Sequence, residues 1–230
     1  MANPAKRART AARPIVPTSE EFKHLEEHGY MVIPGVLTRA ECEAAKAGLA
    51  EWFTGLGTGL SFTDPTTWEP KNRPAHFHGI VQNLGVAHLQ CVWDVRQNER
   101  VVNVFQRMWQ EDDLLSSFDA ICVNPPPKTA PKSKFPFVEG QWYHVDQGRR
   151  RGSERQSIQG IATLSDITRR DQTLSVLPGV HRSHAELLRR HQGGDDDWVL
   201  FDEPLLRWAW QAAGKKGSPR RGTSRLADPL

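Results

Sequence analysis

The sequence predicts an α+β or mostly β fold that carries its helices at the N-terminal end. Two helical segments, residues 18–29 and 37–53, come early, whereas two strand-like segments, residues 157–167 and 173–179, come late and are joined by a polar turn. Helices followed by strands favour a mostly β core with helices packed on it over a sheet of alternating strands and helices. The chain has 230 residues, 38% of them hydrophobic, which is enough for one sizeable core.

The first helix is predicted over "TSEEFKHLEEHG". Thr18 or Ser19 can cap its start, acidic residues fill its first turn, and Gly29 ends it. A short strand, "YMVIPG", is predicted next. The second helix, "LTRAECEAAKAGLAEWF", begins with Thr38 and Glu41 at the spacing of a capping box, in which each side chain accepts a hydrogen bond from a free backbone N–H.

The remaining elements are separated by two long irregular loops, residues 54–75 and 125–139. Between them, "ERVVNVFQRMW" has its apolar residues on one helical face, and "SFDAICVN" is typical of a strand. The strand-like segments "SIQGIATLSDI" and "TLSVLPG" follow the second loop. "SHAELLRR" has a capping-box spacing from Ser183 to Glu186, and "EPLLRWAWQAA" predicts the last helix.

Most of the positive charge lies at the two ends of the chain. Residues 1–17 and residues 214–230 each carry a net charge of +4, and subtracting both from the total of +3 leaves −5 for the residues between them. A nucleic-acid-binding core needs clustered positive charge on its folded surface, so the acidic middle argues against that function for the core. We expect a disordered basic arm (1–17), a single domain (18–213) and a disordered basic tail (214–230).

The cysteines indicate a reducing compartment, and the hydropathy predicts no membrane span. Cys42, Cys91 and Cys122 are far apart and form no CxxC pair, which argues against a disulfide framework or a structural zinc site. No apolar run approaches the length of a membrane span. We expect an intracellular, cytoplasmic protein, and the basic "PAKRAR" leaves a nuclear or organellar address open. The oligomeric state stays open.

The stretch "GQWYHVDQG" places His144 and Asp146 two residues apart. On a strand, side chains at this spacing point to the same face, so the imidazole and the carboxylate can bind one metal ion. With a second imidazole they form the ligand set of non-haem Fe(II) oxygenases. The alternative is a pair of polar residues on a solvated strand face.

Other histidines compete for a metal. His76 and His78 have the same spacing but lie in a proline-rich loop, and His24 and His28 share a helix face beside acidic residues, where solvent exposure is expected. His181 follows a Pro-Gly turn 35 residues after Asp146. In a compact cupin-like barrel a histidine in that position can be a metal ligand.

Three motifs together resemble the phytanoyl-CoA dioxygenase-like family. "EEFKHLEEHGYMVIPGVLTRAEC" is similar to the helix, strand, Pro-Gly and helix at the start of that family, "WYHVDQ" to its metal-binding HxD, and "QTLSVLPGVHRSH" to its strand ending in Pro-Gly-Ser-His. The motifs occur in the family order over roughly residues 20–184.

The resemblance implies a double-stranded β-helix (a cupin-like jelly roll), and Fe(II) and 2-oxoglutarate as cofactors. It implies a dioxygenase that hydroxylates a small or lipid-like substrate, with His144 and Asp146 as iron ligands. Trp142 and Tyr143 would then flank the site, with one of them facing the pocket and the other packing in the core. Gln147 is a weaker candidate for a hydrogen bond near the site.

The sequence departs from the family after His191, because no later histidine exists to supply the distal iron ligand and no arginine corresponds to the family's 2-oxoglutarate partner. A chain truncated before those residues, with a β-helix incomplete at its C-terminus, is one interpretation. The alternatives are a catalytically inactive β-helix binding protein and a cupin-type metalloenzyme with His181 as third ligand. The nearest basic candidates for a carboxylate partner are Arg149 to Arg151 and Arg189 with Arg190, unless they are solvated surface.

Overall fold

The computed structural model describes residues 17–124, 142–167, 171, 173–194 and 197–216. The predicted loop 125–139, most of the basic arm and most of the basic tail lie outside these residues. The helices are α1 (Ser19–His28), α2 (Arg39–Gly55), α3 (Gln90–Arg96), α4 (Glu99–Trp109), α5 (His184–Arg190) and α6 (Glu203–Ala212). The strands are β1 (Ile80–Val81), β2 (Ile121–Cys122), β3 (His144–Val145) and β4 (Val199–Leu200).

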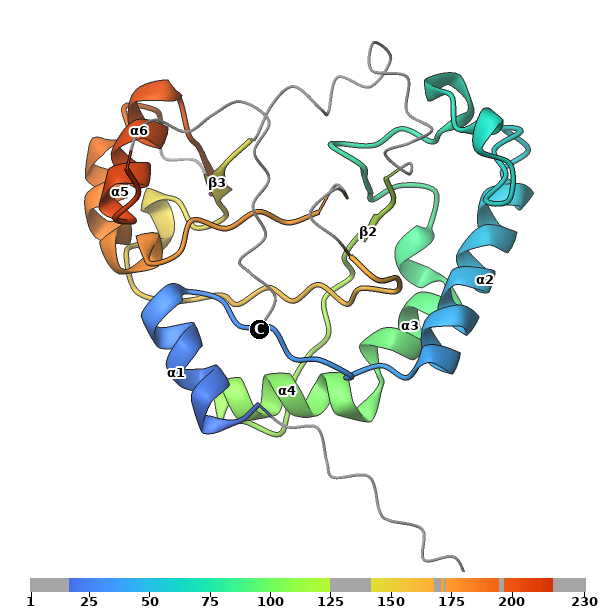
Figure 1. The fold of residues 1–230 in the computed structure, drawn as a ribbon, viewed down its shortest axis with the longest axis horizontal. Helices are drawn as coiled ribbons and strands as arrows, with labels where there is room; N and C mark the ends of the chain where they lie inside the picture. The colour runs from blue at the N-terminus through green and yellow to red at the C-terminus, as the bar shows by residue number, and fades with distance from the viewer. Residues whose placement is uncertain (1–16, 125–141, 168–170, 172, 195–196, 217–230) are drawn as a thin grey trace, which may run out of the picture.

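The arrangement places helices around a centre of extended chain. In Figure 1, α5 and α6 lie beside β3 on one side, α2 and α3 lie on the other, and α1 and α4 run along one edge. Extended segments cross between the two sides. The mixture of helix and strand agrees with the predicted class. The described residues form two antiparallel sheets of two strands each, β1 with β2 and β3 with β4, and do not form a complete double-stranded β-helix.

The two N-terminal helices start as the sequence predicts. Thr18 and Glu21 form a capping box at α1, and Gly29 ends the helix in the left-handed conformation. Thr38 and Glu41 form the capping box of α2. A capping box satisfies two backbone N–H groups locally, and at these two helices the cap residue and the glutamate three positions later form it.

Each of the two sides of the molecule has its own hydrophobic cluster. The cluster beside β3 is built from the inner faces of α5 and α6 and from β4, with Leu187, Val199 and Ala209 almost completely buried. The other cluster contains Phe53 of α2 with Leu60 and Trp68 from the loop that follows. That loop, 54–75, is irregular as expected, apart from two single turns of 3₁₀ helix. The two sheets therefore rest on different cores.

Three predicted strands are absent from the described residues. "YMVIPG" is irregular and ends in a turn, and neither residues 157–167 nor residues 173–177 join a ladder. A strand exists only where a partner completes its backbone hydrogen bonds. Residues 157–167 are held through side-chain contacts instead, and Ile161 is 61% exposed. Their alternating pattern was sufficient for extended chain but not for pairing.

The helix α5 forms, but without the predicted capping box. Ser183 precedes the helix and makes no side-chain cap hydrogen bond. It is the last residue of a 3₁₀ turn, Val180–Ser183, and its ψ of 17° differs from the extended conformation found at Thr18 and Thr38. The preceding turn therefore fixes the backbone in a geometry from which the hydroxyl does not cap.

Within the described residues, no helix combines the length and apolar character needed to cross a membrane. The three cysteines are free thiols, and burial raises the pKa of Cys91 and of Cys122.

Glu41 links α2 to α4, so its removal should destabilise the fold. Its carboxylate accepts hydrogen bonds from the Thr38 backbone at 2.7 Å and from Asn98, and it pairs with Arg100. We expect Glu41→Ala, which removes the acceptor of the capping box, to lower the free energy of unfolding by about 1 kcal/mol, the usual worth of a cap. Since Glu41 is partly exposed, the ion pair adds little to this value.

The loss should depend on pH. The backbone hydrogen bond from Thr38, followed by the Thr38 hydroxyl and Arg100, lowers the pKa of Glu41 from 4.5 to about 2. Stabilisation by a group whose pKa is lower in the folded state is complete above pH 4.5 and disappears as the pH falls toward 2. Urea unfolding across this range tests the prediction, with Glu43→Ala, which removes an exposed pair with Lys46, as the control. A difference that persists unchanged at the lowest pH would contradict it.

Candidate metal centre

The side chains of β3 and its flanking residues point alternately to two faces, one packed on the hydrophobic core and one that carries His144 and Asp146. Tyr143 and Val145 pack against the cluster around α5 and α6, where Val145 pairs with Val199 of β4. Because side chains alternate along a strand, Trp142, His144 and Asp146 point to the opposite face. The predicted juxtaposition of His144 and Asp146 is therefore present, and buried neighbours on the other face hold it in register.

The donor atoms of the pair face each other. His144 Nε2 lies 3.5 Å from Asp146 Oδ1. Two donors that share a metal at bond lengths of about 2.1 Å lie about 3.0–3.4 Å apart, so a small adjustment fits them to one ion. His144 Nδ1 lies 3.1 Å from the Trp142 carbonyl oxygen, to which it can donate a hydrogen bond. The tautomer with Nδ1 protonated leaves Nε2 free to bind a metal.

Asp146 has a second partner that the sequence did not reveal. Gln159 donates a hydrogen bond of 2.8 Å to Asp146 Oδ2, the oxygen that does not face His144. Hydrogen bonds of this kind orient a ligating carboxylate. Gln159 lies 13 residues further along the chain, in the extended segment 157–167, and no short motif connects it to the pair.

The pair also perturbs its own protonation. The hydrogen bond with Asp146 raises the pKa of His144, against the effect of burial. The same hydrogen bond lowers the pKa of Asp146. Both shifts favour an ion pair, and metal binding requires the proton to leave His144.

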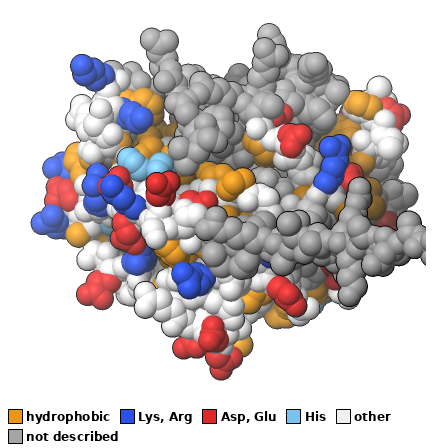
Figure 2. All heavy atoms as spheres, turned by 60° about the horizontal axis from the view of Figure 1, so that its bottom comes forward, with side chains coloured by type: hydrophobic (Ala, Val, Ile, Leu, Met, Phe, Trp, Pro, Cys, Tyr) orange, Lys and Arg blue, Asp and Glu red, His pale blue; other side chains and the backbone are white. Residues whose placement is uncertain are grey.

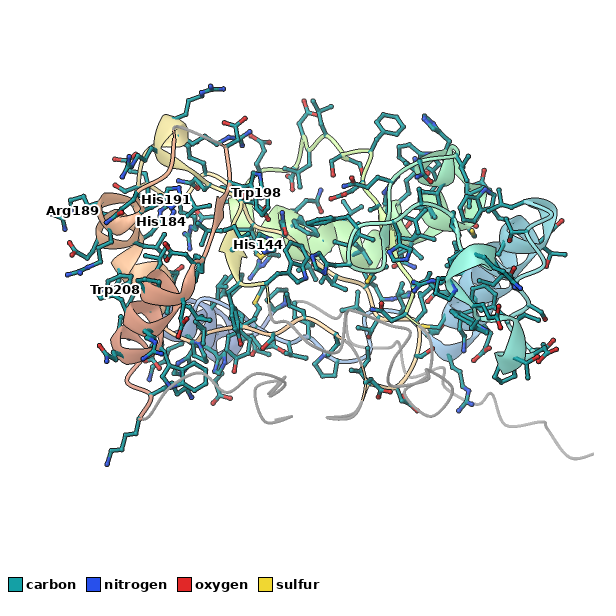
Figure 3. The ribbon with its side chains drawn as sticks, turned by 90° about the horizontal axis from the view of Figure 1, so that it is seen from above. His144, His184, Arg189, His191, Trp198 and Trp208 are labelled. Atoms are coloured by element: carbon teal, nitrogen blue, oxygen red, sulfur yellow. The ribbon has the colours of Figure 1, made fainter. Side chains whose placement is uncertain are left out.

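Aromatic rings surround His144. Trp142 stacks on its imidazole with a centroid distance of 4.2 Å and an angle of 7°, and Trp198 meets it edge-on at 5.8 Å. Figure 3 shows Trp198 beside His144 near the middle of the molecule. Tyr143 instead turns to the core, where its hydroxyl lies 3.0 Å from Ser175 Oγ. Of the two aromatic residues predicted to flank the site, Trp142 faces it and Tyr143 packs away from it.

His181 does not join the pair. Its Nε2 lies 3.0 Å from the carbonyl oxygen of Glu26, and its ring packs so closely on Gly29 that a Cβ there would lie 2.4 Å from Nδ1. The structure uses His181 to fasten the end of α1. In the described residues, no three His, Cys, Asp or Glu side chains are grouped to hold a metal, so the cupin-type ligand set with His181 is not formed there.

The other two histidine pairs make contacts of their own and are not part of a three-residue metal-ligand group in the described residues. The ring centroids of His24 and His28 are 4.4 Å apart, and His24 meets Tyr30 edge-on at 4.7 Å, so the two histidines belong to an aromatic group at the end of α1 rather than to a metal site. His76 Nδ1 accepts a hydrogen bond from the Gly79 backbone. His78 stacks on Trp142 and is therefore part of the surroundings of His144, which the sequence did not predict.

The arginines that follow Asp146 have structural partners. Arg149 donates to the carbonyl oxygens of Leu188 and Gly193 and to that of His191, and so closes the end of α5. The neighbouring Arg150 and Arg151 approach Asp197 on the surface. Arg149 is therefore a cap of α5 and not a carboxylate-binding residue.

The arginines of α5 lie away from the pair. Arg189 and Arg190 both pair with Glu186 on the same helix, and Arg190 also lies 5.1 Å from the Trp208 ring. Figure 3 shows Arg189 on the outer side of α5, away from His144. Charged side chains of both signs gather on this side of the molecule (Figure 2), which agrees with the interpretation as solvated surface.

Gln147 is a structural residue as well. Its amide nitrogen donates to the carbonyl oxygens of Gly152 and Glu154, and its oxygen accepts from the Gln156 backbone at 3.2 Å. These hydrogen bonds stabilise the loop after β3 and use both polar atoms of the Gln147 side chain. The weaker prediction of a role beside the metal is not supported by this geometry.

The profile of one protein family, phytanoyl-CoA dioxygenase (PhyH), matches residues 25–214. The match covers most of the chain and contains His144, Asp146 and the segments that surround them. The chain belongs to the phytanoyl-CoA dioxygenase family. Members of this family have the double-stranded β-helix fold and are oxygenases that depend on Fe(II) and 2-oxoglutarate.

One curated relative adds a distant likeness. The chain is 36% identical over 76 residues to "Ava biosynthesis cluster protein O" from Aspergillus versicolor. The alignment covers 33% of this chain and 25% of the relative, so the chain matches about a quarter of that protein's length. No solved structure matches the chain significantly.

Asp146→Asn should lower the pKa of His144 and destabilise the metal-free protein in a limited pH window. Asp146, with its lowered pKa, contributes stability above pH 3.8 that is lost as the pH falls. His144, with its raised pKa, contributes stability below pH 6.5 that is lost as the pH rises through its folded-state pKa. The loss of stability should therefore be largest between these values.

Histidine NMR titration and urea unfolding of the chelator-treated protein measure the two effects. Asp197→Asn, which removes an exposed acid from two surface ion pairs, is the matched control and should leave the His144 titration unchanged. An unchanged pKa of His144 in Asp146→Asn would show that the two side chains do not interact in solution.

Proposed function

We propose that this chain is an Fe(II)- and 2-oxoglutarate-dependent dioxygenase that hydroxylates a small or lipid-like substrate, with His144 and Asp146 as metal ligands. The observation that carries the proposal is the placement of His144 Nε2 and Asp146 Oδ1 on one face of β3, 3.5 Å apart. Imidazole and carboxylate together suit a divalent iron ion. Membership of the phytanoyl-CoA dioxygenase family supports the choice of metal and cosubstrate.

Each residue around the pair has a defined task in this proposal. The Trp142 carbonyl keeps the proton on Nδ1 of His144, and Gln159 holds the outer oxygen of Asp146. Trp142 and Trp198 provide apolar surface beside the metal, which suits a hydrophobic substrate. When bound, Fe(II) with 2-oxoglutarate and O₂ supplies the oxidising power for hydroxylation of a C–H bond.

The second candidate function is that of a non-catalytic binding protein on the same family scaffold. The observation that favours it is that, within the described residues, no third His, Cys, Asp or Glu is placed to hold a metal together with the pair. The five arginines considered from the sequence have carbonyl or carboxylate partners elsewhere, so none of them is held ready for 2-oxoglutarate. In this reading Trp142 and Trp198 form a binding surface without chemistry.

Anaerobic titration of the full chain with Fe(II) and 2-oxoglutarate distinguishes the two functions. The proposed dioxygenase should develop the weak visible charge-transfer band of the ternary complex, and His144→Gln should lose it because an iron ligand is gone. Loss of an outer partner of a ligand already costs about 10–100-fold in affinity, so the loss of the ligand itself should exceed that.

His181→Gln is the matched control, because His181 fastens α1 and should not affect the band. A folded wild-type protein that develops no band would favour the non-catalytic binding protein. A band that survives in His144→Gln would place the metal elsewhere in the chain.

A further inference from the structure

The turn before β1 presents His78 to the metal centre. Phe77 and Ile80 pair through two backbone hydrogen bonds of 2.9 Å and 2.8 Å, so His78 and Gly79 form the two-residue tip of a small hairpin. Their φ angles are 51° and 86°, as a type I′ turn requires. A Cβ at Gly79 would lie 2.2 Å from Asn124 Oδ1, so glycine fits there. Asparagine is the preferred residue at the first tip position, yet the chain has a histidine.

The imidazole of His78 lies flat on the indole of Trp142. The ring centroids are 4.4 Å apart, and the planes differ by 12°. Phe77 meets the same indole edge-on at 5.0 Å. Contacts of these two geometries are the favourable ones for aromatic pairs, and together they orient the indole plane.

The Trp142 indole in turn stacks on the His144 imidazole and orients it. The two rings are nearly parallel, at 7°, with centroids 4.2 Å apart. Rotation of a histidine ring about its Cβ–Cγ bond is otherwise broad and roughly two-fold, and a half-turn exchanges the sides on which Nδ1 and Nε2 lie. The Trp142 carbonyl holds Nδ1 while the Trp142 indole holds the plane, so Nε2 is left facing Asp146. We call His78, Trp142 and His144 the aromatic stack.

We propose that His78 is a positioning residue of the metal centre, which fixes the plane of the His144 imidazole through the indole of Trp142. His78 is outside the ligand pair, and its ring reaches His144 through the indole of Trp142. The inference rests on the proposed function insofar as it concerns a metal, but the orientation of His144 exists without one. Histidine tolerates the left-handed position, as asparagine does, and in addition supplies the ring that stacks on Trp142.

Two variants distinguish the effect of residue 78 on the stability of the turn from the effect of its ring in the aromatic stack. His78→Asn keeps a residue that the turn prefers and removes the ring, whereas His78→Phe keeps a ring and puts a bulky residue at positive φ. We expect His78→Asn to unfold at the wild-type temperature or above it and to bind Co(II) about 10-fold more weakly. We expect His78→Phe to unfold at a lower temperature and to retain most of the Co(II) affinity.

The second measurement needs no metal. Nitrogen NMR of the chelated protein at alkaline pH, where His144 is neutral, reports which ring nitrogen carries the proton. Wild type should show His144 mainly with Nδ1 protonated, and His78→Asn should show a mixture of tautomers. His88→Asn, which removes a similar ring contact with Phe118 outside the site, is the control and should match wild type in both measurements.

Each result decides the inference. Unchanged tautomers and unchanged Co(II) affinity in His78→Asn would overturn the role of His78. If wild type itself does not bind Co(II), the proposed function fails. The tautomer measurement alone then decides whether His78 positions His144.

Discussion

The pairing of β3 with β4 is the constraint on which the site depends. Val145 and Tyr143 are anchored in the cluster formed with α5 and α6, and Val199, their neighbour on β4, is almost completely buried. A shift of one residue in this register would move the apolar side chains out of the core and the polar ones into it. Burial on one face of the strand therefore keeps His144 and Asp146 together on the other face.

The site also joins parts of the chain that rest on different cores. The hairpin that carries His78 precedes β1, whose partner β2 packs on the cluster around Phe53, whereas His144 belongs to the sheet packed on α5 and α6. Their contact runs through Trp142. The orientation of the candidate ligand thus depends on tertiary structure on both sides of the molecule, which is how a folded scaffold preorganises a metal ligand.

The sequence predicted the features that depend on neighbours in the chain. The cap at Thr18, the capping box at Thr38 and the common face of His144 and Asp146 follow from residues within one turn or two positions of each other. Gln159, Trp198 and His78 reach the site through tertiary contacts that leave no local pattern. The alternating patterns of residues 157–167 and 173–179 predict strands, but ladder formation depends on a partner that their own residues do not specify.

The central claim is that His144 and Asp146 bind the same metal ion from one face of β3. A crystal structure of the Co(II)-soaked protein, with anomalous diffraction collected at the cobalt edge, tests it most directly. The account predicts one strong anomalous peak at bonding distance, about 2.1 Å, from both His144 Nε2 and Asp146 Oδ1. A peak bound to other side chains, or the two groups on opposite faces of the strand, would contradict it.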